Sequence, residues 1–158
     1  MLVKDIIATD FVNYKEPSMY VAFPYCSFKC DRENGCQLCQ NSSLVKQPSI
    51  EISPERVVEI YEKNKPLCKA LVCCGLEPLD SFGDVLDLIV EFRTKFDDPV
   101  IIYTGYTEEE AATYVDALKK FTNIIIKFGR FRPWQPHHVD ELLGVELVNP
   151  EQYAKRIS

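Results

Sequence analysis

The chain has 158 residues, of which 46% are hydrophobic and 27% charged, a composition typical of one globular domain spanning residues 1–158. Its net charge of −6 argues against nucleic acid as a main partner, because phosphate binding usually requires a basic face. No apolar run approaches the roughly 20 residues that a membrane helix needs, and the N-terminus lacks the apolar region of a signal peptide. We therefore expect a cytoplasmic protein that binds neither nucleic acid nor membrane.

Strand and helix patterns alternate along the chain. Ser53 suits a helix N-cap before Pro54, Thr107 suits another before three glutamates, and residues 83–96 carry an apolar face at helical spacing. Short apolar runs of the kind found in buried strands predict six strands. They lie at residues 5–8, 20–23, 70–73, 100–103, 124–126 and 145–148.

This alternation predicts an α/β fold with a parallel sheet and helices on its outside. A complete eight-stranded barrel typically takes roughly 250 residues, so we expect a partial (open) parallel β/α barrel of about five or six strands. In parallel sheets the functional site forms at the carboxyl ends of the strands. This rule selects the segments 26–39, 74–78, 104–106 and 127–132.

Seven cysteines are the unusual feature of the composition. An odd number without a signal peptide argues against a disulfide framework. Four of the seven fall within residues 26–39, and such a cluster in a reducing compartment indicates metal or redox chemistry. The seven are Cys26, Cys30, Cys36, Cys39, Cys68, Cys73 and Cys74.

Several interpretations of these cysteines compete. Thiolates are ligands of iron–sulfur clusters and also of zinc. A structural zinc site usually joins two short cysteine pairs on separate knuckles, whereas all four cysteines here lie in one loop. Cys36 and Cys39 have the spacing of a dithiol redox pair, but they do not open a helix after a strand. An alternative for Cys68, Cys73 and Cys74 is that they are free cysteines that fill apolar space without any chemical role.

The cysteine loop resembles the signature of radical S-adenosylmethionine (SAM) enzymes, in which three cysteines are spaced C-x3-C-x2-C with an apolar residue before the last. Nearly the whole chain resembles the activating proteins of anaerobic ribonucleoside-triphosphate reductases, and the similar stretches follow that family's order. These stretches are Asp10–Tyr14, Glu16–Pro17, Cys26–Asn41, Cys74–Pro78, Ile102–Thr107, Lys127–Phe131 and Asn149–Tyr153.

The resemblance implies Cys26, Cys30 and Cys39 as the catalytic and metal-binding residues, which hold a [4Fe–4S] cluster with one iron left open for SAM. One departure concerns the second and third cysteines. Eight residues separate Cys30 from Cys39 where the signature has two, so the loop carries a six-residue insertion that includes Cys36. A longer loop costs little entropy. In the alternative register Cys36 replaces Cys30 as the second ligand. This register keeps the two-residue spacing before Cys39 but loses the three-residue spacing after Cys26.

A second motif, Cys74-Gly75-Leu76-Glu77-Pro78, resembles the family's Gly-Gly-Glu-Pro motif, which binds the methionyl amino group of SAM. Glycine permits an open backbone edge, and the glutamate can accept a hydrogen bond from an ammonium group. A plain strand-to-helix turn is the alternative interpretation, since Cys74 replaces the first glycine and Leu76 is extra. The expected SAM contacts are Leu38, Cys74, Gly75, Glu77, Pro78, Thr104 and Lys127.

Thr104 and Lys127 end later strands, where they would contact the ribose or the carboxylate of SAM. A turn hydroxyl and a solvated lysine are the alternatives for these two. Candidates for a docking surface are Arg130 and Arg132 with Phe131 and Trp134, because arginine and aromatic side chains anchor interfaces, and a plain surface loop is the alternative.

The resemblance implies a radical SAM oxidoreductase with two cofactors, a [4Fe–4S] cluster and SAM. It would cleave SAM to a 5′-deoxyadenosyl radical and generate a glycyl radical on the large subunit of an anaerobic ribonucleotide reductase. A low-potential donor such as flavodoxin or ferredoxin would supply the electron. Two alternatives stay open: a radical SAM enzyme acting on another polypeptide or a small molecule, and a zinc- or cluster-binding interaction module without catalysis.

Overall fold

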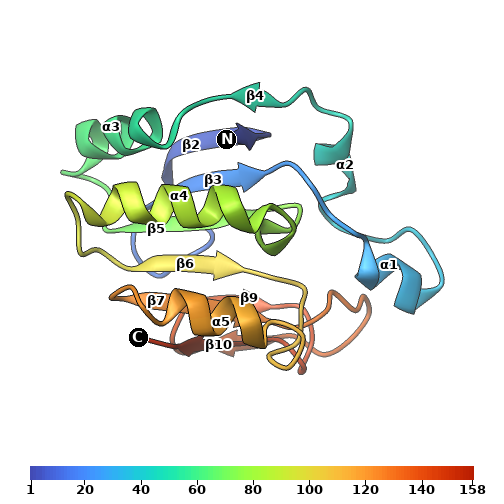
Figure 1. Ribbon diagram of the computed structural model, residues 1–158. Helices are drawn as coiled ribbons and strands as arrows, with labels where there is room; N and C mark the ends of the chain where they lie inside the picture. The colour runs from blue at the N-terminus through green and yellow to red at the C-terminus, as the bar shows by residue number, and fades with distance from the viewer.

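A six-stranded mixed sheet forms the centre of the molecule in the computed structural model, which describes residues 1–158 (Figure 1). The strands follow the order β10-β7-β6-β5-β3-β2. The four inner strands are parallel, and the two edge strands are antiparallel to their neighbours. The inner strands are β3 (Ser18–Phe23), β5 (Ala70–Gly75), β6 (Val100–Tyr103) and β7 (Ile124–Phe128), and the edges are β2 (Asp5–Asp10) and β10 (Tyr153–Arg156).

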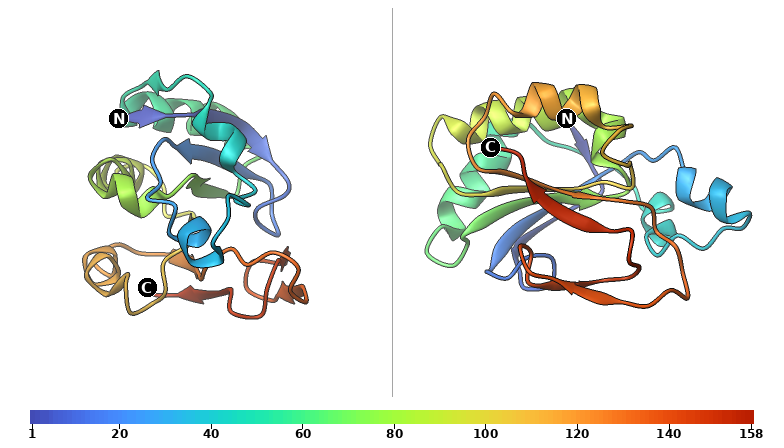
Figure 2. Two further views of the ribbon diagram at one scale, coloured as in Figure 1. Left: turned by 90° about the vertical axis from the view of Figure 1, so that its right-hand side faces the viewer. Right: turned by 90° about the horizontal axis from the view of Figure 1, so that it is seen from below.

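Three helices cover one face of this sheet (Figures 1 and 2). Each has an apolar side that packs into the larger core cluster together with the inner strands. The Ser53 side chain accepts a hydrogen bond from the Arg56 amide, as expected for an N-cap. The helices are α3 (Pro54–Asn64), α4 (Phe82–Arg93), which follows the short 3-10 turn η1 (Pro78–Ser81), and α5 (Ala112–Leu118).

The opposite face of the sheet is covered by a C-terminal hairpin of strands β8 (His138–Asp140) and β9 (Val145–Leu147) (Figure 2, right). Leu143 and Leu147 of this hairpin pack with Tyr14 and with strand residues such as Val72 and Ile101 in a second apolar cluster. Both faces of the inner strands are therefore buried, which explains their continuous apolar sequences.

The remaining elements are short. Strands β1 (Leu2–Val3) and β4 (Ile50–Glu51) pair with each other, and helices α1 (Lys29–Asn34) and α2 (Ser42–Val45) lie beyond the carboxyl ends of the inner strands (Figure 1). Neither α1 nor α2 contains a buried residue. None of the helices has the length and apolar character needed to cross a membrane.

The α/β class is confirmed. Five of the six predicted strands lie in the central sheet, whereas the run 145–148 forms β9 of the separate C-terminal hairpin and β10 takes the sixth place in the sheet. The sheet is mixed where a parallel one was expected, because the chain returns at both edges in antiparallel strands. The helix expected after Thr107 begins only at Ala112. The backbone N–H groups of Thr107 and Glu110 each donate to the other residue's side chain, as in a capping box, but the turn that follows is irregular. Two of its three glutamates form ion pairs with basic residues of other segments.

Candidate functional site

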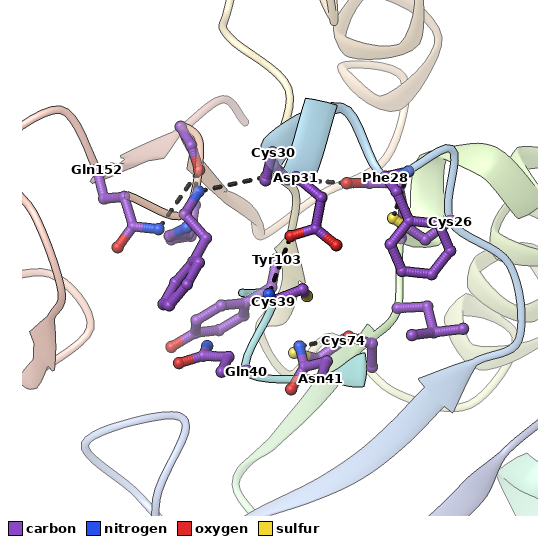
Figure 3. A pocket seen from close by; sticks show the side chains of 17 residues that line it. Cys26, Phe28, Cys30, Asp31, Cys39, Gln40, Asn41, Cys74, Tyr103 and Gln152 are labelled. Atoms are coloured by element: carbon purple, nitrogen blue, oxygen red, sulfur yellow. Dashed lines mark hydrogen bonds between the residues drawn. The ribbon is translucent and has the colours of Figure 1, made fainter. Parts of the chain in front are cut away.

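A pocket lies at the carboxyl ends of the four parallel strands, as the strand-end rule predicts (Figure 3). Segments from the cysteine loop, from the ends of β5, β6 and β7, and from the C-terminal region form its wall. Seven of the predicted site residues line it: Cys26, Cys30, Cys39, Cys74, Gly75, Glu77 and Lys127.

Three thiols of the cysteine loop face this pocket, and all three are free and half-buried. Cys26 follows β3, Cys30 lies in α1, and Cys39 precedes α2. The backbone N–H of Phe28 donates to Cys26 Sγ at 3.2 Å, and that of Phe131 donates to Cys30 Sγ at 3.3 Å. Burial raises the pKa of the Cys26 thiol to about 12 and also raises the pKa of Cys39. No three Cys, His, Asp or Glu side chains of the chain stand close enough to hold a single metal ion.

The insertion between Cys30 and Cys39 folds back on itself. Helix α1 ends at Gly35, whose positive φ of 69° reverses the chain direction at little steric cost. Asp31 Oδ1 then accepts hydrogen bonds from the backbone N–H groups of Leu38 at 3.1 Å and Cys39 at 2.9 Å. Asp31 therefore returns the third cysteine to the neighbourhood of the second, despite the eight residues between them.

Cys36 lies outside the pocket. Its side chain is exposed, and Sγ donates to the carbonyl oxygen of Asn34 at 3.4 Å. The other three cysteines of the loop line the same pocket, whereas Cys36 lies on the outer side of the insertion.

Helix α1 is held to the body of the protein by polar contacts around Arg130. Its guanidinium group, only 4% exposed, lies 2.9 Å from Glu33 in α1 and 2.7 Å from Glu110. Asn34 Nδ2 donates to the carbonyl oxygen of Phe131 at 3.0 Å. The prediction of Arg130 as part of a docking surface is therefore wrong, because its side chain is buried and paired with two half-exposed carboxylates, whereas Trp134 is 83% exposed.

Glu77 is buried at the floor of the site and accepts three hydrogen bonds. They come from Thr104 Oγ1 at 2.7 Å, the Gly105 N–H at 2.8 Å and the Leu79 N–H at 3.1 Å. Burial raises the pKa of the Glu77 carboxyl to about 7, although these hydrogen bonds lower it. Glu77 therefore ties the end of β5 to the end of β6.

Lys127 is a buried amine in the wall of the pocket, not a solvated lysine. Its Nζ donates to the Gly129 carbonyl oxygen at 3.2 Å, and burial lowers its pKa to about 8. Thr104 is buried behind Glu77, so it supports the carboxylate and does not line the pocket. Leu38 and Pro78 also lie outside the lining.

A family model described as a 4Fe-4S single cluster domain matches residues 18–142 of the chain. The chain belongs to this 4Fe-4S single cluster domain family. The matched region includes the cysteine loop, all four parallel strands and most of the pocket wall. No curated protein matches the chain. Membership supports the iron–sulfur interpretation of the cysteines over the zinc and dithiol alternatives.

The residues of the pocket fit a cluster of this 4Fe-4S family by the chemistry of their donors. Cysteine thiolates are the usual ligands of [4Fe–4S] clusters, and hydrogen bonds to the sulfurs tune such clusters. Cys26 and Cys30 already accept backbone N–H bonds of this kind. Cys26, Cys30 and Cys39 would hold the cluster, which supplies one-electron chemistry when it is bound.

Several lining residues of this 4Fe-4S domain could not be assigned from the sequence. Asn41 Nδ2 donates to the Gly75 carbonyl oxygen at 2.7 Å and so joins the cysteine loop to the end of β5. Tyr103 and Gln152 also line the pocket. All three lie in stretches that resemble the activating-protein family, and this was the only signal that marked them.

We expect Asp31 to be important for cluster loading in this 4Fe-4S domain. Asp31→Ala removes the acceptor that holds Leu38 and Cys39, so the iron content after anaerobic reconstitution should fall at least about threefold, because each lost charge-assisted hydrogen bond contributes roughly 1.5–3 kcal/mol. Asp31→Asn, which keeps one acceptor oxygen, should retain more iron. Equal iron content in wild type and Asp31→Ala would contradict this role.

Proposed function

We propose that the chain is a radical SAM enzyme of the activating-protein type, with Cys26, Cys30 and Cys39 as the three ligands of its cluster. The observation that carries this proposal is that the loop presents three thiols to one pocket and turns its fourth, Cys36, outward. Three protein ligands leave one iron of a four-iron cluster without a protein ligand. Catalytic metal sites differ from structural ones in having such an open coordination position.

Glu77 and Lys127 supply the groups that an amino-acid moiety requires. A carboxylate offers about four lone-pair sites, and Glu77 uses three, which leaves one for the methionyl ammonium group of SAM. The ammonium group of Lys127 has three N–H donors and one protein partner, so two remain for the SAM carboxylate. The two groups line the same pocket as the three thiols.

The chemistry belongs to the cofactors. Cys26, Cys30 and Cys39 would hold the cluster, which when reduced would supply the single electron for reductive cleavage of SAM to methionine and a 5′-deoxyadenosyl radical. The chain's own residues bind and orient SAM: Glu77 and Lys127 hold its methionyl end, and Gly75 leaves the end of β5 open beside it.

The proposed substrate is a glycine in the large subunit of an anaerobic ribonucleotide reductase, and sequence resemblance supports it. Two of the similar stretches, Lys127–Phe131 and Asn149–Tyr153, come together beside the pocket, where Gln152 Nε2 lies 3.4 Å from the Gly129 carbonyl oxygen. These two stretches, which resemble the activating-protein family, form part of the pocket wall. Such a wall is compatible with a reaction on a protein loop that enters the pocket from solvent.

The experiment is reductive cleavage of SAM by the reconstituted protein with dithionite under anaerobic conditions. We expect 5′-deoxyadenosine and methionine in equal amounts, measured by chromatography. Adding the reductase from the same organism should give a doublet in the electron paramagnetic resonance (EPR) spectrum from a glycyl radical. Cleavage without a doublet, with a competent reductase, would redirect the proposal to another polypeptide or a small molecule.

A second candidate function rests on Cys74, whose thiol lines the same pocket. If Cys74 were a fourth ligand, the cluster would be closed and would serve electron transfer or assembly without catalysis. Cys74→Ala distinguishes the two functions. The radical SAM proposal predicts that this variant keeps its iron and its SAM cleavage, and loss of the cluster would favour the second function.

A further inference from the structure

Asp80 is a half-buried carboxylate that lies outside the cysteine pocket and has no role in the proposed function. It belongs to the 3-10 turn η1, three residues after Glu77. Its Oδ2 accepts a hydrogen bond from the Ser27 backbone N–H at 2.5 Å, and its Oδ1 accepts one from the Tyr106 hydroxyl group. Asp80 therefore joins the segment that follows Cys26 to the loop that follows β6.

The residue after Ser27 has an unusual backbone conformation. Phe28 has a φ of 52° and a ψ of 39°, in the left-handed region that bulky side chains rarely adopt. Such a conformation persists only where surrounding contacts fix it. On one side Asp80 holds the Ser27 N–H, and on the other the Phe28 carbonyl oxygen accepts from the Arg32 N–H of α1 at 3.1 Å. These two contacts fix the turn at Phe28.

This turn places a hydrogen-bond donor on a predicted cluster ligand. The Phe28 N–H donates to Cys26 Sγ at 3.2 Å (Figure 3). Burial raises the pKa of the Cys26 thiol, and the hydrogen bond from Phe28 opposes this rise. The N–H group therefore stabilises negative charge on the sulfur, and negative charge is what a cluster gains when it accepts an electron.

From these contacts we infer that Asp80 is a positioning residue: it holds the Phe28 N–H on Cys26 Sγ, and this hydrogen bond raises the reduction potential of the cluster. Hydrogen bonds to cluster sulfurs are among the determinants of the potential, because they stabilise the more negative, reduced state. Tyr106 in turn holds Asp80. The inference rests on the proposed role of Cys26 as a cluster ligand, but it does not depend on SAM.

The test separates this role from the charge of Asp80 by comparing two neutral variants. Asp80→Asn keeps an oxygen that accepts from the Ser27 N–H and gains an amide group that donates to the Tyr106 hydroxyl oxygen, whereas Asp80→Ala has neither group. Both variants lose the same negative charge. Potentiometric titration of the reconstituted proteins without SAM, followed by EPR, gives the midpoint potential of each cluster.

We expect reduction of the cluster to be about tenfold less favourable in Asp80→Ala than in Asp80→Asn, a difference of about 59 mV for one electron. The iron content of Asp80→Asn should equal that of the wild type. Equal potentials in the two neutral variants would overturn the inference, and so would a higher potential in Asp80→Ala.

Tyr106→Phe tests the same contact with the Asp80 charge in place. It keeps the ring beneath Lys29 Nζ, which lies 3.9 Å from the ring centroid, and removes only the hydroxyl group that holds Asp80. Reduction should become about twofold or more less favourable than in the wild type. The control Tyr114→Phe removes a hydroxyl group from the neighbouring ring, 6.2 Å away between centroids, without removing a partner of Asp80, and should leave the potential unchanged.

The tyrosine pair decides the question if Asp80→Ala does not retain its cluster, since equal potentials in Tyr106→Phe and Tyr114→Phe would overturn the inference. Because the titration contains no SAM, a protein that fails to cleave SAM still tests the role of Asp80. Retention of the cluster in Cys26→Ala would contradict the ligand assignment and would overturn the inference with it.

Discussion

Replacing Cys26, Cys30 or Cys39 by alanine is expected to abolish the cluster, whereas Cys36→Ala should leave it nearly intact. The first three thiols face one pocket, and Cys36 is exposed outside it. A cluster with two remaining protein ligands lacks the coordination that holds it, so the loss should be close to complete. Iron and sulfide analysis of each reconstituted variant measures this.

The alternative register makes the opposite prediction for two of these variants. If Cys36 were a ligand in place of Cys30, Cys36→Ala would lose the cluster and Cys30→Ala would keep it. Retention of iron in Cys30→Ala would therefore contradict the assignment. Cys68→Ala is not a suitable control, because its buried thiol donates to the Ala8 carbonyl oxygen and its loss would disturb the core.

The second large effect is expected at Gly75. Its φ of 93° is rarely adopted by other residues, and an added Cβ would lie 2.7 Å from the Cα of Ala22. Overpacking and the left-handed backbone together should destabilise Gly75→Ala by about 2–5 kcal/mol. Because Asn41 binds the Gly75 carbonyl oxygen, the shift should also loosen the cysteine loop and lower iron loading.

Gly83 provides the matched control for this variant. It lies in the first turn of α4 with no heavy atom within 4 Å of its added Cβ. Gly83→Ala should therefore raise stability by up to about 1 kcal/mol, since alanine favours helix. Thermal unfolding under anaerobic conditions measures both variants, and a melting temperature of Gly75→Ala equal to wild type would contradict the close approach of β3 and β5.

Much of the fold can be predicted because buried parallel strands have continuous apolar sequences. The runs 70–73, 100–103 and 124–126 correspond to β5, β6 and β7. Strand β10 cannot be found in this way, because it is an edge strand with three exposed residues and two charged ones among its four. Its pairing with β7 depends on where the preceding hairpin directs the chain.

The cysteine loop can be predicted from its spacing, but the contacts that shape it cannot. Asp31 positions Cys39 only because α1 turns the chain back, and the sequence does not show the direction of that turn. Arg130 is predicted at the surface since arginine is rarely buried, yet it meets Glu33, which is 97 residues away in the sequence. Such long-range ion pairs leave no local pattern.

The most direct measurement of the central claim is the EPR spectrum of the reduced cluster before and after addition of SAM. If three cysteines hold the cluster and one iron is open, SAM binds that iron and changes the spectrum of the wild-type protein. The Cys74→Ala variant should show the same change, and Glu77→Gln should require a higher SAM concentration. A spectrum that SAM leaves unchanged in a fully loaded, reducible wild-type sample would contradict the open iron and with it the proposed function.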